Sequence, residues 1–352
     1  PRKKHCALPP GDSRRHLDHV PSLANCQVAF VSLFANLKNM ALKDAHFFSP
    51  ELESLPAGPP YSCTELTQWA GNAFQMTPTD SRLQIIHDGG TIDSPPLDNL
   101  VGMVKAWQTH PEWLDFLDPN APNYNEKKLE RDLYLHHWAS WIPTTGNVLD
   151  LGGGVGRFTT WLLDQGLAVD LVDPDLRSLW RALQHAKGRA GKIDLHWSTG
   201  ECLPDIGPFD AVFAAEVLCY VEDPKAVLEK IAQSLKPNAP LLLSVEARWG
   251  WAQSLDAAPG TLPALLTDGI VHVPGDRWIR TYTQAELLEL LSDWEVSMIS
   301  PTHYASSGPF EAAAGLLSLD ELLVVEEALR QREETKHLNR AWMAVARKPV
   351  DG

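Results

Sequence analysis

The sequence predicts an α/β protein in which strands alternate with helices around a mostly parallel sheet. The first observation is the stretch Val148–Gly156, where an apolar run leads into closely spaced glycines and then into a helical pattern. The second is the apolar run 167–172, which ends in Asp173, seventeen positions after Gly156. The third is the succession of apolar runs and amphipathic segments downstream, which is typical of strand–helix units.

The glycine-rich turn is predicted to approach a ligand. A strand that reverses into a helix while exposing its backbone needs residues without Cβ at its tightest points, and Gly152, Gly154 and Gly156 occupy them. The helix predicted over 157–165 directs free N–H groups at the turn, and Gly166 stands at its C-terminal cap. A polar or anionic ligand group is therefore expected here.

The spacing of these glycines excludes a dinucleotide-binding turn. That fingerprint, G-x-G-x-x-G beginning at Gly152, requires glycine at position 157, where the chain has Arg157. The observed pattern is acidic-x-Gly-x-Gly-x-Gly, with Asp150 closing the strand. It resembles the first motif of class I S-adenosylmethionine (SAM)-dependent methyltransferases. Asp173 is then well placed to accept both ribose hydroxyls of the cofactor.

The resemblance extends over roughly residues 125–349. Within the family, the chain is similar to the quinone-biosynthesis methyltransferase group. Residues 199–204 are similar to the family's adenine-lining motif, although the family often has Asp where this chain has Thr199, so adenine recognition is left to the backbone, Thr199 or Glu201. Residues 209–221 resemble its fourth strand and the helix after it, and residues 241–245 resemble its fifth strand. The cofactor-binding residues implied are Asp150, Gly152, Gly153, Gly154, Gly156, Asp173, Pro174, Thr199, Gly200, Glu201, Glu216 and Val217.

The resemblance implies a Rossmann-like, seven-stranded, mostly parallel sheet with an antiparallel C-terminal hairpin. We assign the hairpin to residues 294–300 and 341–346. Capping boxes at Thr283 and Ser318 predict the helices that follow the fifth and sixth strands. The apolar stripe of residues 127–141 predicts a helix packed beside the first strand.

Three segments are expected along the chain. Residues 1–40 form an extension that is compatible with a targeting segment, an unstructured tail or a misplaced translation start. Residues 41–124 are rich in proline and are expected to form an N-terminal cap over the cofactor or a dimerisation region. Residues 125–349 form the methyltransferase domain.

Composition favours a soluble enzyme acting on a small molecule. The formal net charge of −15 argues against nucleic acid as a partner. No apolar run has the roughly 18 residues that a membrane span requires. The five cysteines lack C-x-x-C pairing, so neither a disulfide framework nor a metal site is suggested, and a reducing, cytoplasmic location is expected. The sequence leaves open whether the protein is a monomer or a homodimer.

The chemistry expected is in-line displacement at the sulfonium methyl group, with oxygen, nitrogen or carbon as the acceptor. Such a reaction gains from alignment and from exclusion of water. A base would assist a hydroxyl or amine acceptor, and His303 and Tyr220 are the catalytic candidates, although either could instead serve in packing. Two alternatives remain: an enzyme that consumes SAM differently, such as a cyclase acting on its aminobutyl chain, and a non-catalytic SAM-binding partner subunit.

Overall fold

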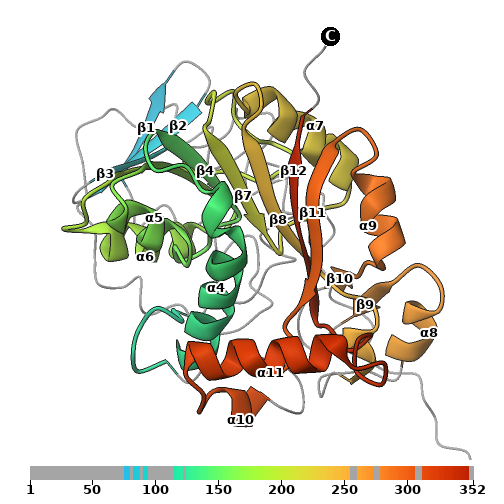
Figure 1. Cartoon of the computed structure of the whole chain (residues 1–352). Helices are drawn as coiled ribbons and strands as arrows, with labels where there is room; N and C mark the ends of the chain where they lie inside the picture. Colours follow the sequence, from blue (N-terminus) through green and yellow to red (C-terminus); the bar gives the residue numbers. More distant parts are fainter. Residues whose placement is uncertain are drawn as a thin grey trace, which may run out of the picture.

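Ten strands form one twisted sheet in the computed structural model (Figure 1). The structure describes residues 115–121, 124–253, 260–272, 278–305 and 311–348, together with the backbone of three earlier strands. The earlier strands are β1 (Gln75–Thr79), β2 (Arg82–His87) and β3 (Gly90–Asp93). The order across the sheet is β1-β2-β3-β6-β5-β4-β7-β8-β12-β11. The remaining strands of this sheet are β4 (Asn147–Leu151), β5 (Ala168–Asp173), β6 (Lys192–Trp197), β7 (Ala211–Ala215), β8 (Pro240–Glu246), β11 (Glu295–Thr302) and β12 (Ala341–Arg347).

The seven strands from β6 to β11 confirm the predicted architecture. β6, β5, β4, β7 and β8 are parallel neighbours. β12 runs antiparallel to β8 and pairs with β11 as the C-terminal hairpin. β3 adds in parallel to the free edge of β6, so the N-terminal strands continue the same sheet. Short periodic patterns in the sequence also predict helices over 65–71 and 97–107, and these segments lie outside the described residues.

Side chains along the central strands point alternately into two apolar layers, one on each face of the sheet. Val148, Phe213 and Leu242 face one layer, which contains residues of α4 (Tyr124–Trp138) and α5 (Thr159–Asp164). Their neighbours Leu149 and Leu243 face the other layer, which contains residues of α7 (Pro224–Ser234) and α9 (Gln284–Leu290). Because strand side chains alternate with period two, the central strands are buried on both faces.

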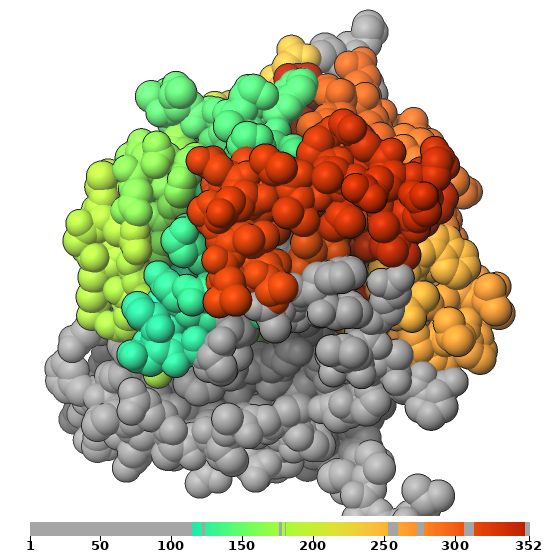
Figure 2. Space-filling model, turned by 60° about the horizontal axis from the view of Figure 1, so that its bottom comes forward, coloured from blue at the N-terminus to red at the C-terminus, as the bar shows by residue number. Residues whose placement is uncertain are grey.

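Two helices join at the end of the sheet where the parallel strands terminate. α11 (Leu319–Gln331) packs against α4 through Leu129, Leu133 and Leu322. The space-filling view of this end shows α11 (red) beside the green surface of α4 (Figure 2). A short helix, α10 (Glu311–Ala314), precedes α11. This pair of helices lies beyond the carboxyl ends of β7 and β8, where ligands bind in open α/β sheets.

Several elements differ from the sequence-based expectations. The predicted helix over 157–165 begins only at Thr159, because Gly156 adopts a left-handed φ of +94° and the turn continues through Phe158. The helix predicted over 127–141 ends at Trp138 and continues as the short η3 (Ala139–Trp141). Several elements were not predicted, among them β6, α6 (Leu176–Ala186), α8 (Thr261–Leu265), β9 (Ile270–His272) and β10 (Trp278–Arg280). Within the described part of the chain, no helix is long and apolar enough to cross a membrane.

Candidate functional site

The glycine turn between β4 and α5 leaves open space at one position. Gly152, Gly154 and Gly156 have φ of +66°, +56° and +94°, a region that L side chains rarely adopt. A Cβ on Gly152 would lie 2.5 Å from Cγ2 of Val217, so this glycine permits close packing. A Cβ on Gly154 would meet no described atom within 4 Å. The turn therefore packs closely against Val217 at Gly152, which is otherwise exposed, and has room for a ligand group beside the half-buried Gly154.

Asp150 holds the turn from beneath. Its Oδ2 atom accepts hydrogen bonds from the Thr159 backbone N–H at 3.0 Å and from the Thr159 hydroxyl at 2.6 Å. Burial raises the pKa of Asp150 to about 6, against the opposing effect of these two hydrogen bonds. A Cβ on Gly153 would lie 2.6 Å from Asp150 Oδ2, which explains the glycine there. The predicted cofactor-binding carboxylate is thus directed at the start of α5.

Asp173 supports the same turn from the end of β5. Its Oδ2 accepts the Gly154 N–H at 2.9 Å and its Oδ1 accepts the Asp175 N–H at 2.8 Å. Burial, assisted by the nearby charges of Asp175 and Asp150, raises the pKa of Asp173 to about 7. The carboxylate therefore stands beside the accessible glycine, as the sequence predicts for a residue that accepts ribose hydroxyls.

The loop predicted to line the adenine is tied to its neighbours. Glu201 accepts the Glu222 N–H at 3.0 Å, which links this loop to the one that follows β7. Thr199 accepts the Cys202 N–H at 3.2 Å through its hydroxyl. A Cβ on Gly200 would lie 3.0 Å from Val227, and the Pro174 carbonyl accepts the indole N–H of Trp197. The structure thus gathers this loop with the turn at one end of the sheet.

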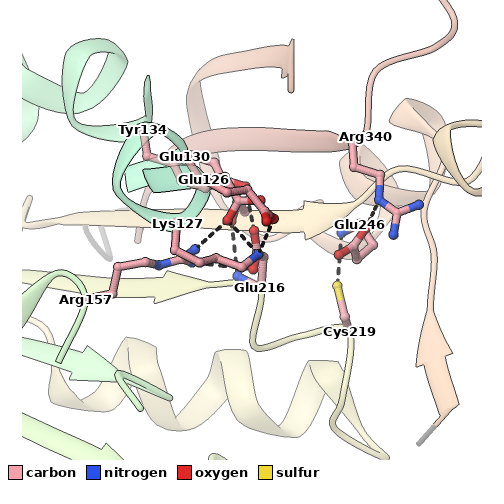
Figure 3. Close-up of polar contacts among 10 residues, drawn as sticks. Glu126, Lys127, Glu130, Tyr134, Arg157, Glu216, Cys219, Glu246 and Arg340 are labelled. Atoms are coloured by element: carbon pink, nitrogen blue, oxygen red, sulfur yellow. Dashed lines mark hydrogen bonds and ion pairs between the residues drawn. The ribbon is translucent and has the colours of Figure 1, made fainter. Parts of the chain in front are cut away.

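Glu216, which follows β7, belongs to a partly buried ionic network: its side chain is 25% exposed, whereas those of Glu130 and Arg157 are buried. The carboxylate accepts the Tyr134 hydroxyl at 3.0 Å and lies 3.4 Å from the Arg157 guanidinium. Arg157 also contacts Glu130 at 3.1 Å, and Lys127 contacts Glu130 at 2.9 Å. Figure 3 shows these side chains converging from α4, the glycine turn and β7. Although burial opposes ionisation, the nearby Arg157 and Lys127 charges hold the pKa of Glu216 at about 2.

His303, which follows β11, lies in the same region, and within the described part of the chain neither of its ring nitrogens has a hydrogen-bond partner. Its side chain is buried and its ring centroid lies 4.5 Å from that of Tyr134. Burial lowers the pKa of His303, against the opposing attraction of Glu130, Glu326 and Glu216, so the imidazole is neutral. Buried polar atoms without partners are rare in proteins and need an explanation.

His303 and Glu216 share an unusual backbone conformation. Their φ angles are +61° and +62°, which cost of order 1–3 kcal/mol each for residues other than glycine. Such strain is concentrated at functional sites. Tyr220, the other catalytic candidate, is partly buried and packs against the apolar layer that contains residues of α7.

Sequence reasoning missed the ionic network itself. Lys127, Glu130 and Tyr134 are spaced i, i+3 and i+7, which places them on one face of α4. That spacing was available, but an apolar stripe on the same helix dominated the interpretation. Arg157 was used to exclude a dinucleotide turn and was given no role of its own. Glu246, at the end of β8, pairs with Arg340 at 3.3 Å and accepts the Trp251 indole N–H at 3.0 Å.

Comparison with known proteins gives consistent matches. A family model described as a methyltransferase domain matches residues 113–295. A ubiquinone biosynthesis O-methyltransferase from Idiomarina loihiensis is 36% identical over 99 residues, covering 28% of this chain and 41% of the relative. An uncharacterized methyltransferase from Mycobacterium tuberculosis is 31% identical over 171 residues, covering 44% of this chain and 66% of the relative.

One solved structure is also similar to this chain. An S-adenosylmethionine dependent methyltransferase from Mesorhizobium loti aligns with a TM-score of 0.46 and 18% identity, over 62% of this chain and 99% of that one. The chain spans only 41% and 66% of the length of the two curated relatives.

The ionic network generates a prediction about Arg157. Arg157→Met leaves the buried carboxylate of Glu130 and the partly buried carboxylate of Glu216 with less compensation, and we expect it to lower the free energy of unfolding by about 3 kcal/mol at pH 7. Because the pKa of Glu216 then rises, the loss should be smaller at pH 4, where Glu216 is partly protonated. Urea denaturation of wild type and variant at both pH values measures this difference.

A second variant provides the control for Arg157. On a Glu216→Gln background the same Arg157→Met change should cost less, since one buried charge has been removed. An equal cost at both pH values and on both backgrounds would show that the network is unimportant to stability.

Proposed function

The chain belongs to the methyltransferase-domain family, and on this premise we propose that it transfers the methyl group of SAM to a small-molecule acceptor. The observation that carries the proposal is the accessible Gly154 beside the Asp173 carboxylate, at the ends of adjacent parallel strands. A nucleoside lying along this edge would meet backbone at the turn and a carboxylate at the ribose.

Each predicted cofactor residue has a role in this proposal. Asp150, Gly152, Gly153 and Gly156 shape the turn, and Gly154 and Asp173 meet the adenosyl group. Pro174, Thr199, Gly200 and Glu201 form the loops on either side of the adenine. Glu216 and Val217 follow β7 and border the end of the cofactor that carries the methyl group. The buried network around Glu216 would exclude water from that end, which favours methyl transfer to the acceptor over hydrolysis.

His303 is the proposed base. A neutral imidazole with two free ring nitrogens accepts a proton from the acceptor as the methyl group arrives, and Tyr220 remains the second candidate. An oxygen acceptor is favoured by relatives named ubiquinone biosynthesis O-methyltransferase. The site also favours an oxygen acceptor. Glu130, Glu216 and Glu246 are each paired with a cationic side chain, so none of these three carboxylates is free to bind the ammonium group of an amine acceptor.

The test of the proposed function is incubation with SAM that carries a labelled methyl group. With SAM and a small-molecule extract, the label should enter a low-molecular-weight product and S-adenosylhomocysteine should form in equal amount. With SAM alone, neither product should appear. Methylthioadenosine formed without extract would instead indicate cyclisation of the aminobutyl chain, and binding of SAM with no product in either mixture would indicate a non-catalytic subunit.

Gly154 provides a test of the cofactor position with an internal control. Gly154→Ala and Gly166→Ala both place a Cβ in open space at positive φ, so both should lower stability by a similar amount, about 1–2 kcal/mol. Only Gly154→Ala should weaken binding of S-adenosylhomocysteine, by about tenfold or more. Calorimetric titration and thermal unfolding of the two variants separate these effects, and equal affinities would place the nucleoside elsewhere.

Asp173 predicts how cofactor affinity depends on pH. Ribose hydroxyls donate to the ionised carboxylate, whose pKa in the free protein is about 7, so binding should strengthen as the pH rises through 7. Between pH 6 and pH 8 the affinity for S-adenosylhomocysteine should increase about tenfold. In Asp173→Asn the affinity should be lower and nearly independent of pH over this range. A wild-type affinity that does not change would remove Asp173 from the ribose site.

His303→Asn tests the base. Asparagine tolerates the left-handed backbone of this position but does not accept a proton near neutral pH. The rate of label incorporation should fall about 10²–10⁴-fold, while the affinity for S-adenosylhomocysteine stays within about twofold of wild type. A variant with the wild-type rate would show that the acceptor needs no base or uses Tyr220.

A further inference from the structure

We propose that Tyr134 is a positioning residue for methyl transfer, whose hydroxyl and ring hold Glu216 and His303 in the orientations that the reactants meet. The proposal rests on the proposed function and deepens it. Tyr134 lies on α4, outside every motif that identified the cofactor residues, and it contacts residues that follow two different strands, β7 and β11.

The hydroxyl of Tyr134 fixes Glu216. It donates to Glu216 Oε1 at 3.0 Å, while Arg157 lies 3.4 Å from the other carboxylate oxygen. The two contacts restrain a carboxylate that would otherwise be free to rotate at the end of a strained backbone segment. Burial and the charge of Glu216 raise the pKa of Tyr134 well above its usual value, so the hydroxyl remains a donor throughout the working pH range.

The ring of Tyr134 fixes His303. With no hydrogen bond on either nitrogen, the imidazole takes its orientation from packing, and its ring is tilted by 39° against the Tyr134 ring. Tyr134 is itself held firmly: its side chain is fully buried and stacks on Trp138 with centroids 5.0 Å apart and an interplanar angle of 17°. α4 thus supplies a rigid support for a histidine that lacks polar anchors.

Trp138 offers a matched comparison. It lies one turn along α4 from Tyr134, is equally buried and packs on Tyr134, Phe158 and Phe213. Among the described residues, Trp138 makes no ring contact and no hydrogen bond with Glu216 or His303. A substitution at Trp138 therefore disturbs the same helix and the same apolar layer without removing a contact to Glu216 or His303.

The experiment compares Tyr134→Phe, Tyr134→Leu and Trp138→Phe in the full chain. Tyr134→Phe should lower the initial rate of label transfer from SAM into a small-molecule extract by about 10–100-fold, because small misplacements of reacting groups have effects of this size. Its affinity for S-adenosylhomocysteine should stay within about twofold of wild type. Tyr134→Leu should lower the rate further, since it also removes the ring. Trp138→Phe should keep most of the rate even where its melting temperature falls further than that of Tyr134→Phe.

A second measurement does not depend on activity. Histidine-selective nitrogen NMR spectra are recorded with S-adenosylhomocysteine bound, and the His303 signals are assigned by their loss in His303→Asn. These signals should move strongly in Tyr134→Leu and little in Trp138→Phe. A wild-type rate in Tyr134→Phe, or rates that follow melting temperature across all three variants, would overturn the proposal. If wild type itself transfers no label, the proposed function fails, and unmoved His303 signals would overturn the support that Tyr134 gives this histidine.

Discussion

The buried carboxylate of Asp150 is the contact on which the site depends. It lies within the central strand β4 and accepts both the backbone N–H and the hydroxyl of Thr159, so it joins the strand to the helix across the glycine turn. The two donors offset part of the penalty of burial, and its pKa of about 6 shows that the offset is incomplete. This contact fixes the reversal of the chain, which leaves the outer side of the turn, at Gly154, open to a ligand.

The second constraint is the way α4 packs on that turn. Its apolar stripe packs into the layer with Phe158, while Glu130, which also pairs with Lys127, contacts Arg157 at the end of the glycine turn. Buried ion pairs add little to stability relative to apolar packing, because desolvation consumes most of the Coulomb attraction. Their effect here is geometric: the pairs allow one register of α4 against the turn, and that register brings Tyr134 to Glu216.

Much of this arrangement could be predicted from the sequence. The order of strands, the glycine turn, Asp173 and the capping boxes at Thr283 and Ser318 are local patterns, and the structure confirms each as an element in its expected place. The strand β6 and the helix α6 escaped prediction because β6 mixes charged and apolar residues and no capping residue was recognised before α6. The contact of Tyr134 with Glu216 joins residues 82 positions apart, and no local pattern encodes it.

The backbone of Glu216 and His303 shows why the part of the site around these two residues is harder to predict. Both residues stand immediately after a strand in the left-handed region, where sequence preference would favour glycine or asparagine. Rules that predict backbone conformation from the preference of each residue type fail at such positions, because the surrounding contacts determine the backbone conformation. For Glu216 the contacts are the Ser244 carbonyl and hydroxyl on its N–H, and the Tyr134 and Arg157 groups on its carboxylate.

For His303 the backbone carbonyl accepts the Arg340 N–H, and the next residue, Tyr304, donates to the Glu326 carboxylate. The ring receives no comparable polar support, although its backbone is held on both sides. The chain therefore maintains strain at this residue while leaving its two nitrogens without partners. A purely structural histidine would gain from a hydrogen bond at either nitrogen, so the fixed backbone and the unpartnered imidazole agree with the proposal that this ring meets a reactant.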